Sequence, residues 1–310
     1  MFDASETRVL TLFAIPKAFV GEFAALQRNA IVSWTLLKPA TEIILFGDED
    51  GTAKLAHELH LQHVPEVAVN EYGTPLLDDL FAKAQALASG SLLAYVNADI
   101  ILMDDFTKEV SRVSRRKKPF VLGGRRSNLA VEGVLAFEAG WQDRLRSEVR
   151  IRGRLGASTG IDYFVFPKGT WNEVPPFAIG RTMWDNWLLY YARARRYPVI
   201  DASETITVVH QLHGYSHLPP QADTAWKGPE THRNWDLARG IQYAFTLDDA
   251  THRLTPGGLR RCFGWKDLQQ YLMRFPVLHP RRKLMVKAAA TLLFLTQRMA
   301  PGFKNQSLKG

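Results

Sequence analysis

Apolar runs and helical patterns alternate along the first half of the chain. Residues 8–15 form an apolar run that stops at Pro16, which is typical of a buried strand. In residues 19–34 the apolar positions recur at helical spacing. Residues 42–46 form a second apolar run that ends in an acidic, glycine-flanked turn at residues 47–51. This order predicts a βαβ unit, and in such sheets ligands bind where the strands end.

The clearest helix signal begins at Thr74. Thr74 fits the N-cap position, Pro75 fits the first helical position, and the apolar spacing continues until Gly90. The helix leads into an apolar strand at residues 92–96, which runs into the triplet Asn97-Ala98-Asp99 and a further apolar stretch. A buried, unpaired carboxylate costs on the order of several kcal/mol, so this Asp is expected to have a partner such as a cation.

The alternation continues until about residue 210. The expected elements are a surface helix at 105–117, strands at 119–122 and 161–166, a helix at 184–195 and two short strands within 199–210. Residues 211–250 are rich in His, Trp, Pro and polar residues, and they predict loops and short helices. Together the elements predict an α/β fold with a mixed, mostly parallel sheet flanked by helices. We expect a catalytic domain at 1–250 and a helical, basic C-terminal extension at 251–310.

Charge is concentrated at the C-terminal end of the chain. The 310 residues are 46% hydrophobic and 23% charged, as in ordinary globular proteins, and their formal net charge is +8. Residues 251–310 hold twelve Lys or Arg and one acidic residue, a net +11, which leaves −3 for the other 250 residues. The main domain is therefore mildly acidic and no nucleic-acid partner is expected. The single cysteine, Cys262, excludes an internal disulfide framework and a multi-thiolate metal site.

The sequence predicts no membrane span. The N-terminus lacks the basic leader of a secretory signal, and the longest apolar stretch near the other end is far shorter than the ~18 residues that cross a bilayer. A cytoplasmic location is expected. Residues 281–304 combine Arg and Lys with a short apolar helix, a pattern that suits an anionic membrane surface at the inner face. Packing of Leu284, Ala288, Leu292 and Leu295 on the catalytic domain is an equal alternative.

Several short motifs occur in an order typical of one enzyme family. They are the strand ending in Ile15-Pro16, the turn Phe46-Gly-Asp-Glu49, Tyr95-Val-Asn-Ala-Asp99, Asp162-Tyr-Phe-Val-Phe166, Gly180-Arg-Thr-Met-Trp-Asp-Asn-Trp187 and a His near the end of the core. With this order the chain resembles the nucleotide-sugar-dependent glycosyltransferases of the GT-A fold, in particular the family-2-like group. The resemblance implies a Rossmann-like catalytic domain, a nucleotide-sugar donor with UDP as its expected nucleotide, and a glycan or lipid-linked glycan acceptor.

The resemblance also implies a divalent cation, Mn²⁺ or Mg²⁺. Family members usually carry Asp-x-Asp, and this chain has Asn97-Ala98-Asp99, so Asp99 is expected to hold the metal and Asn97 to contribute a neutral oxygen to ribose or a metal-bound water. His210 is expected to complete the metal shell. His213 and His217 are placed on the following loop, within reach of the diphosphate. A zinc site on His210, His213 and His217 is a rival, although it lacks a neighbouring acidic or thiolate ligand in the sequence, and a structural role for His210 stays open.

The other site residues follow from the same resemblance. Ile15, Pro16, Asp48 and Glu49 are expected to contact the nucleotide, although a solvated acidic turn would have the same sequence. Asp185 is expected to be the general base that inverting members use to take the proton of the acceptor hydroxyl. Its competing role is a helix cap, because Thr182 to Asp185 has a capping-box pattern. Asp162 has two possible roles, to orient the acceptor or to cap a strand. Arg125 and Arg126 either bind phosphates or lie in solvent.

Glycosyl transfer with inversion is therefore the leading hypothesis. A sugar nucleotidyltransferase is a second, but the first strand is not followed by the glycine-rich Lys/Arg loop that holds a triphosphate. A non-catalytic carbohydrate-binding protein is the third. The donor sugar and the acceptor have no readable signature in the sequence.

Overall fold

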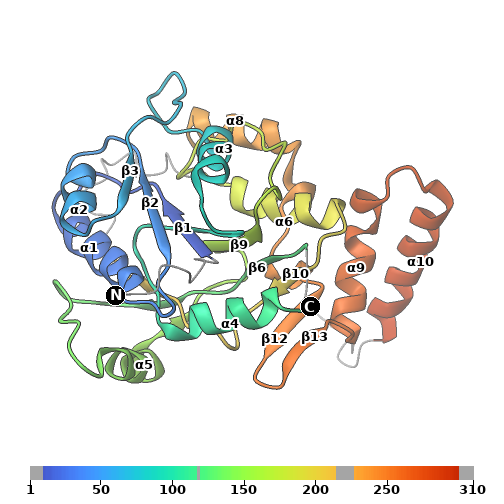
Figure 1. Ribbon diagram of the computed structural model, residues 1–310. Helices are drawn as coiled ribbons and strands as arrows, with labels where there is room; N and C mark the ends of the chain where they lie inside the picture. Colours follow the sequence, from blue (N-terminus) through green and yellow to red (C-terminus); the bar gives the residue numbers. More distant parts are fainter. Residues whose placement is uncertain (1–9, 117–118, 214–226, 300–310) are drawn as a thin grey trace, which may run out of the picture. The chain divides into compact units, whose positions relative to one another are not determined.

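The computed structural model describes residues 10–116, 119–213 and 227–299 of the chain, with side chains up to residue 296 (Figure 1). The chain divides into two compact units, residues 1–260 and 261–310. Each unit is described by itself.

The first unit is built on a nine-stranded sheet. Its strands are β1 (Leu10–Ala14), β2 (Glu42–Phe46), β3 (Gln62–Val64), β4 (Leu92–Val96), β6 (Val121–Gly123), β9 (Tyr163–Pro167), β10 (Val199–Asp201), β12 (His252–Thr255) and β13 (Gly258–Arg261). The strand order is β13-β12-β10-β6-β9-β4-β1-β2-β3. β9 runs antiparallel to its neighbours β4 and β6, while β1, β2, β3 and β4 are parallel to one another. The predicted mixed, mostly parallel sheet is confirmed.

A smaller sheet of four strands holds the segment after β4. It contains β5 (Ile100–Ile101), β7 (Ser127–Leu129), β8 (Arg154–Leu155) and β11 (Val209–Gln211), in the order β5-β11-β7-β8. Its register aligns Ile100 with His210, His210 with Asn128, and Asn128 with Arg154. Directly paired residues point to the same face of a sheet, so these four residues cross one face of it.

Helices cover both faces of the large sheet (Figure 1). The helices of this unit are α1 (Glu22–Thr35), α2 (Thr52–Glu58), α3 (Leu77–Leu87), α4 (Asp104–Ser114), α5 (Trp141–Arg152), α6 (Trp184–Ala194) and α8 (Pro229–Ala238), with short 3₁₀ turns at Ile241–Tyr243 and Leu247–Asp249. Of these, α5 packs on the small sheet. Side chains of β1 alternate between the faces, as a strand requires. Leu12 packs with Trp34 of α1 and Phe106 of α4. Phe13 packs in an aromatic layer with Phe81 of α3.

The start of α3 differs from the expectation. Thr74 does not cap the helix, because Leu76 occupies the N-cap position and the helix begins at Leu77. Pro75 and Leu76 are instead extended and form isolated bridges with Val69 and Ala178. A long-range pairing outweighed the local capping pattern here. The short elements α2 and β3 were not predicted from the sequence. They follow β2, and β3 pairs with it in parallel, which adds a second βαβ unit.

The boundary between the two units lies later in the sequence than expected. The division lies after Arg260 rather than after residue 250, because β12 pairs with β10 and so extends the large sheet. The second unit contains α9 (Trp265–Leu278) and α10 (Lys283–Met299). Leu272, Phe275 and Ala289 are buried between the two helices, with Val286 and Leu293 packed against them. Among the described residues, no helix has the length and apolar character needed to cross a membrane.

Candidate functional site

The site lies at the carboxyl ends of β1 and β4. The two strands are parallel and align Phe13 with Tyr95, so the chain leaves them side by side, toward Pro16 on one strand and Asn97 on the next. Pro16 is buried and Ile15 half-buried, and the side chain of Ile15 lies directly against Gly47 at the end of β2. The three strand ends therefore form one edge, where ligands of open α/β sheets bind.

Three metal-ligating side chains converge beside this edge. Asp99, His210 and His213 each offer an atom within 4.8 Å of the others. Nε2 of His210 lies 3.4 Å, and Nε2 of His213 3.8 Å, from Oδ2 of Asp99. We call this group the Asp99 cluster. The structure brings together the two predicted ligands, Asp99 and His210, and adds His213 to them. The alternative zinc set also includes His217, which lies outside the described residues.

The Asp99 cluster has the electrostatics of a cation site. Although burial raises the pKa of Asp99, the hydrogen bond and charge of His210, with the charges of His213 and Lys17, hold it below its usual value. Burial lowers the pKa of His213, which favours the neutral imidazole that can bind a metal. Oδ1 of Asp99 and Nδ1 of His210 are buried without a hydrogen-bond partner. Such orphaned atoms are costly unless a ligand satisfies them.

The donor set fits a divalent cation and bears on which one. One carboxylate with two imidazoles suits Mn²⁺ and zinc-like ions better than Mg²⁺, which prefers an all-oxygen shell.

Lys17 adds a positive charge next to the cluster. It follows Pro16 at the end of β1, and its charge acts on both Asp99 and His213. The side-chain amide of Gln27 on α1 fixes this turn, since it accepts from the Lys17 amide at 2.7 Å and donates to the Lys17 carbonyl at 2.8 Å. The ammonium group of Lys17 lies 4.7 Å from the ring centroid of Phe23. No sequence pattern had singled out Lys17.

An ion pair between Arg126 and the buried Asp162 lies beside Asn97. Asp162 is 5% exposed and accepts two hydrogen bonds from Arg126, at 3.0 and 2.9 Å. It also accepts from the side-chain amide of Asn97 at 2.8 Å, and its carbonyl accepts from the Asn97 amide. Asn97 is therefore held by Asp162 through its nitrogen, and its oxygen accepts from the hydroxyl of Tyr95. Of the roles considered for Asp162 and Arg126, neither a strand cap nor a solvated arginine describes this pair.

Tyr95 shows that Asp185 belongs to the same site. Burial raises the pKa of the Tyr95 hydroxyl, and the negative charges of Asp99, Asp162 and Asp185 add to this effect in that order. The charges of three carboxylates therefore act on one hydroxyl, although Asp99 follows β4, Asp162 precedes β9 and Asp185 lies in α6. Burial also raises the pKa of Asp185 itself to about 7, with a further contribution from Asp162.

Asp185 does not form the capping box that its sequence allows. The N-cap of α6 is Met183, which has a φ of 89° and makes no side-chain cap. The hydroxyl of Thr182 instead accepts from the indole of Trp235. The half-buried carboxyl of Asp185 lies at the first turn of α6, where the backbone amides of Asp185 and Asn186 interact with it. Trp184 and Trp187 are 6% and 8% exposed and pack in the aromatic core, so neither forms an open sugar platform.

The acidic turn after β2 stands apart from the cluster. Asp48 and Glu49 are exposed, in the turn where Gly47 and Gly51 take positive φ before α2 begins. Within the described residues, no hydrogen bond or ion pair joins either carboxylate to the Asp99 cluster. Their predicted contact with the nucleotide stays a prediction.

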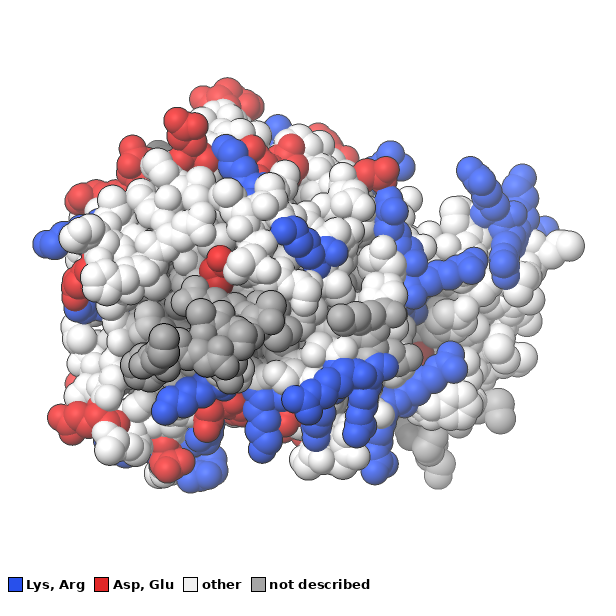
Figure 2. All heavy atoms as spheres, in the orientation of Figure 1, with Lys and Arg blue, Asp and Glu red and all other residues white. Residues whose placement is uncertain are grey.

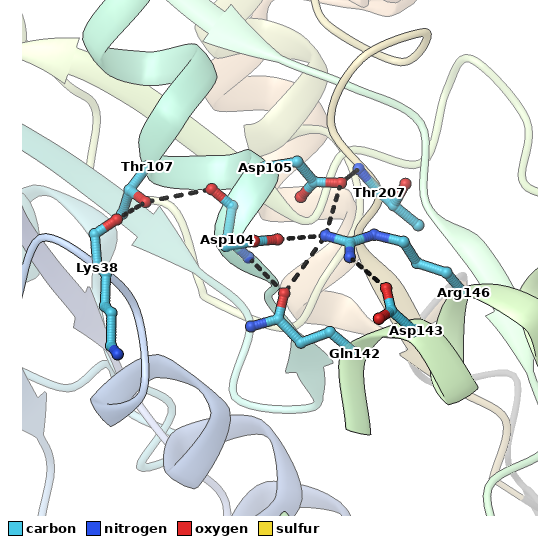
Figure 3. Close-up of polar contacts among 8 residues, drawn as sticks. All are labelled: Lys38, Asp104, Asp105, Thr107, Gln142, Asp143, Arg146 and Thr207. Carbon is cyan, nitrogen blue, oxygen red and sulfur yellow. Dashed lines mark hydrogen bonds and ion pairs between the residues drawn. The ribbon is translucent and has the colours of Figure 1, made fainter. Parts of the chain in front are cut away.

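A network on α4 and α5 supports the strand that holds His210 (Figure 3). The Arg146 guanidinium of α5 pairs with Asp104 and Asp105 at the start of α4. Asp105 in turn accepts from the Thr207 amide at 3.2 Å, just before β11. A cavity of about 410 Å³ lies next to this network. The guanidinium of Arg146 is already paired with carboxylates, so it is not free to bind a ligand. We therefore assign this network to positioning β11 and not to the site.

A second support is buried beneath the cluster. Gln211, next to His210 on β11, donates to the Asp99 carbonyl at 3.0 Å and to the Leu26 carbonyl at 2.8 Å. Asn29 on α1 donates to the Gln211 side chain at 2.9 Å, and both residues are fully buried. These contacts fix the positions of Asp99 and His210 relative to each other.

Comparison with known proteins places this architecture. No protein-family model matches the chain, and no curated protein matches its sequence. Its structure is similar to residues 1–349 of TarS from S. aureus, solved in complex with UDP-GlcNAc, with 12% identity and a TM-score of 0.53 over 87% of this chain and 72% of that one. The fold is GT-A-like.

A second solved structure is also similar. It is glucosyl-3-phosphoglycerate synthase from Mycobacterium tuberculosis in complex with Mn²⁺, UDP and glucosyl-3-phosphoglycerate, with 12% identity and a TM-score of 0.45 over 76% of this chain and 81% of that one. The fold class predicted from the sequence motifs is thus confirmed by the sheet and by the similarity to TarS.

Proposed function

We propose that this protein is a glycosyltransferase that moves a sugar from a UDP-linked donor to a hydroxyl acceptor, with a divalent cation and with inversion at the anomeric carbon. One observation carries the proposal: the Asp99 cluster lies at the carboxyl edge of a GT-A-like sheet, and the charge of the Asp185 carboxylate acts on the same Tyr95 hydroxyl as the charge of Asp99. A metal-binding group and a separate base are the two parts that transfer from a nucleoside diphosphate sugar requires.

Asp99, His210 and His213 would hold the cation. When bound, Mn²⁺ would neutralise the charge that develops on the departing diphosphate. The Lys17 ammonium is positioned to add a second positive charge near the same oxygens. Ile15 and Pro16 would contact the nucleotide at the strand edge, together with Asp48 and Glu49 from the turn after β2.

Asp185 would act on the acceptor. Its carboxylate takes the proton of the acceptor hydroxyl while the oxygen attacks the anomeric carbon from the face opposite the departing UDP. One carbon–oxygen bond forms as the bond to the β-phosphate oxygen breaks. A carboxylate whose pKa is raised to about 7 is a stronger base than an ordinary Asp and is still ionised in about half of the molecules at neutral pH.

The two other functions make different demands on the chain. A nucleotidyltransferase must hold a triphosphate, and β1 is followed by the short turn at Pro16 and Lys17, without a glycine-rich loop. A carbohydrate-binding protein needs exposed aromatic faces, and the tryptophans next to Asp185 are buried. Both observations favour transfer.

We also propose an anionic membrane surface as a partner of α10. Leu284 is 83% exposed, and Leu292 and Leu295 are about half exposed, at 45% and 48%. At 100° per residue these three lie on one side of the helix, away from the Val286 and Leu293 side that packs on α9. Figure 2 shows Lys and Arg side chains gathered where α9 turns into α10. The sequence there contains Arg281, Arg282 and Lys283. An apolar stripe with flanking cations is the pattern of a helix that lies on a charged bilayer.

The proposed activity is tested by incubating the protein with Mn²⁺ and a panel of radiolabelled UDP-sugars. Release of UDP with a labelled sugar product supports transfer, and exchange that depends on pyrophosphate supports the nucleotidyltransferase. Saturable sugar binding without turnover supports the binding protein. Asp99→Asn should abolish turnover at unchanged folding stability, with Asp236→Asn on the exposed surface of α8 as the matched control. An Asp99→Asn variant with a near-normal rate would remove the metal assignment.

A further inference from the structure

The outer end of the small sheet continues the metal site with polar groups that the proposed mechanism does not use. One face of this sheet runs Ile100, His210, Asn128 and Arg154 in direct register. Ile100 is packed in the core and His210 belongs to the Asp99 cluster. The next two positions outward are polar or charged, and each neighbouring strand lies about 4.8 Å further from His210.

The opposite face of the same sheet is filled. Ile101, Leu129 and Val209 pack with Leu145 of α5 in a separate apolar cluster. The polar face therefore points away from α5, toward the side on which the Asp99 cluster lies.

Arg126 belongs to the polar face as well. Gly156 donates to the Arg126 carbonyl at 2.8 Å and so continues the β7–β8 pairing. A Cβ placed on Gly156 would lie 3.1 Å from Cγ of Arg126 and 3.6 Å from Nδ2 of Asn128. The absent side chain at Gly156 thus keeps open the space between these two residues.

Two of these groups lack partners in the part of the chain that the structure describes. Oδ1 of Asn128 is buried without a hydrogen-bond partner. The guanidinium of Arg154 is exposed and makes no hydrogen bond or ion pair among the described residues. The guanidinium of nearby Arg152, in contrast, is paired with Glu148. A buried amide oxygen needs a donor such as a hydroxyl, and a free guanidinium recognises a phosphate or a carboxylate.

We propose that Asn128 and Arg154 form the acceptor subsite and that the acceptor carries an anionic group, a phosphate or carboxylate, next to the hydroxyl that receives the sugar. Oδ1 of Asn128 accepts from an acceptor hydroxyl, and the guanidinium of Arg154 binds the anionic group at the outer edge. Arg126 is held by Asp162 and positions the inner wall of the subsite. This proposal rests on the proposed function and names the chemical class of its acceptor.

The diphosphate of the donor is the other anion that Arg154 could meet, and the experiment separates the two. Protein saturated with Mn²⁺ and UDP is titrated calorimetrically with glucose 6-phosphate and with glucose, a charged and a neutral probe of the same ring. We expect saturable binding of glucose 6-phosphate to this complex and at least tenfold weaker binding of glucose. Arg154→Gln should weaken glucose 6-phosphate binding at least tenfold and leave UDP binding unchanged, and Asn128→Ala should weaken both sugars. Arg152→Gln is the matched control and should change neither.

Failure of this proposal differs from failure of the proposed function. If Mn²⁺ and UDP do not bind, the proposed function itself fails. If they bind but glucose 6-phosphate does not, or binds equally well to Arg154→Gln, the anionic acceptor subsite is overturned. A loss of UDP affinity in Arg154→Gln would assign the guanidinium to the donor and likewise overturn it.

Discussion

Nε2 of His213 lies 3.8 Å from Oδ2 of Asp99, although 113 positions of sequence separate the two residues. His213 follows β11 and Asp99 follows β4. The antiparallel pairing of β5 with β11 brings the two strand ends together. His210 enters the same cluster from within β11, so a three-residue spacing in the sequence brings two imidazoles to one carboxylate.

His213 is therefore expected to contribute to metal affinity. His213→Ala should weaken Mn²⁺ binding by about 10- to 100-fold, as removal of one supporting group around a metal typically does. The measurement is calorimetric titration with MnCl₂ in the presence of UDP. His57→Ala, at the exposed end of α2, is the control and should leave the affinity unchanged. Equal Mn²⁺ affinity in His213→Ala and the unaltered protein would limit the metal shell to Asp99 and His210.

Asp185 should give the rate its pH dependence. The carboxylate is active as a base only when ionised, and burial raises its pKa to about 7. The logarithm of kcat/KM should therefore fall with a slope of one as pH drops below about 7, and level off above that value. An ordinary Asp would show no such decline until about pH 4.

The variant Asp185→Asn separates catalysis from structure. It should lower kcat by about 10²- to 10⁴-fold with nearly unchanged UDP affinity, because the base acts on the acceptor. Asp248→Asn, in the exposed part of a 3₁₀ turn, provides the control. A pH limb near 7 that persists in Asp185→Asn would assign the titration to another group.

The strands and the long helices could be predicted because their apolar periodicity is local. β1, β2, β4 and α6 lie within a few residues of the expected ranges, and the Asp99 position follows from the strand that precedes it. Thr74 and Thr182 show the limit of this approach. Both match capping patterns, but Thr74 hydrogen-bonds with Asn70 and Thr182 accepts from Trp235.

Part of the candidate site could also be predicted from local patterns. Asp99, His210 and Asp185 each end or begin an element with a readable pattern. Lys17, Tyr95 and the Asp162–Arg126 pair gain their roles from strand order and register. Strand order and register bring together residues that are far apart in the sequence, so no local pattern predicts the contacts of these residues.

The buried Asn29–Gln211 contact should be important for stability. Asn29→Ala leaves the Gln211 side chain, the Gly133 carbonyl and the Leu135 amide without the partner that Asn29 provides. Each buried polar group left unsatisfied costs about 1–3 kcal/mol, so the free energy of unfolding should fall by about 3 kcal/mol. Urea denaturation measures this change, with exposed Gln62→Ala as the control. Because Gln211 also donates to the Asp99 carbonyl, Mn²⁺ affinity should fall with it, and a fully stable Asn29→Ala protein would contradict this account.

The exposed stripe of α10 should bind anionic bilayers. Replacing Leu284, Leu292 and Leu295 by Ser removes apolar surface that is already exposed, so the α9–α10 packing through Leu293 and Ala289 should persist. The full chain should co-sediment with phosphatidylserine-containing vesicles at low salt and less at high salt, since each Lys or Arg near the surface contributes about 1 kcal/mol. The triple Ser variant should lose this binding, whereas Ile151→Ser, which removes an equally exposed apolar side chain from α5, should not. Neutral phosphatidylcholine vesicles should bind neither protein. Equal sedimentation of the triple variant and the unaltered chain would exclude the stripe as a membrane contact.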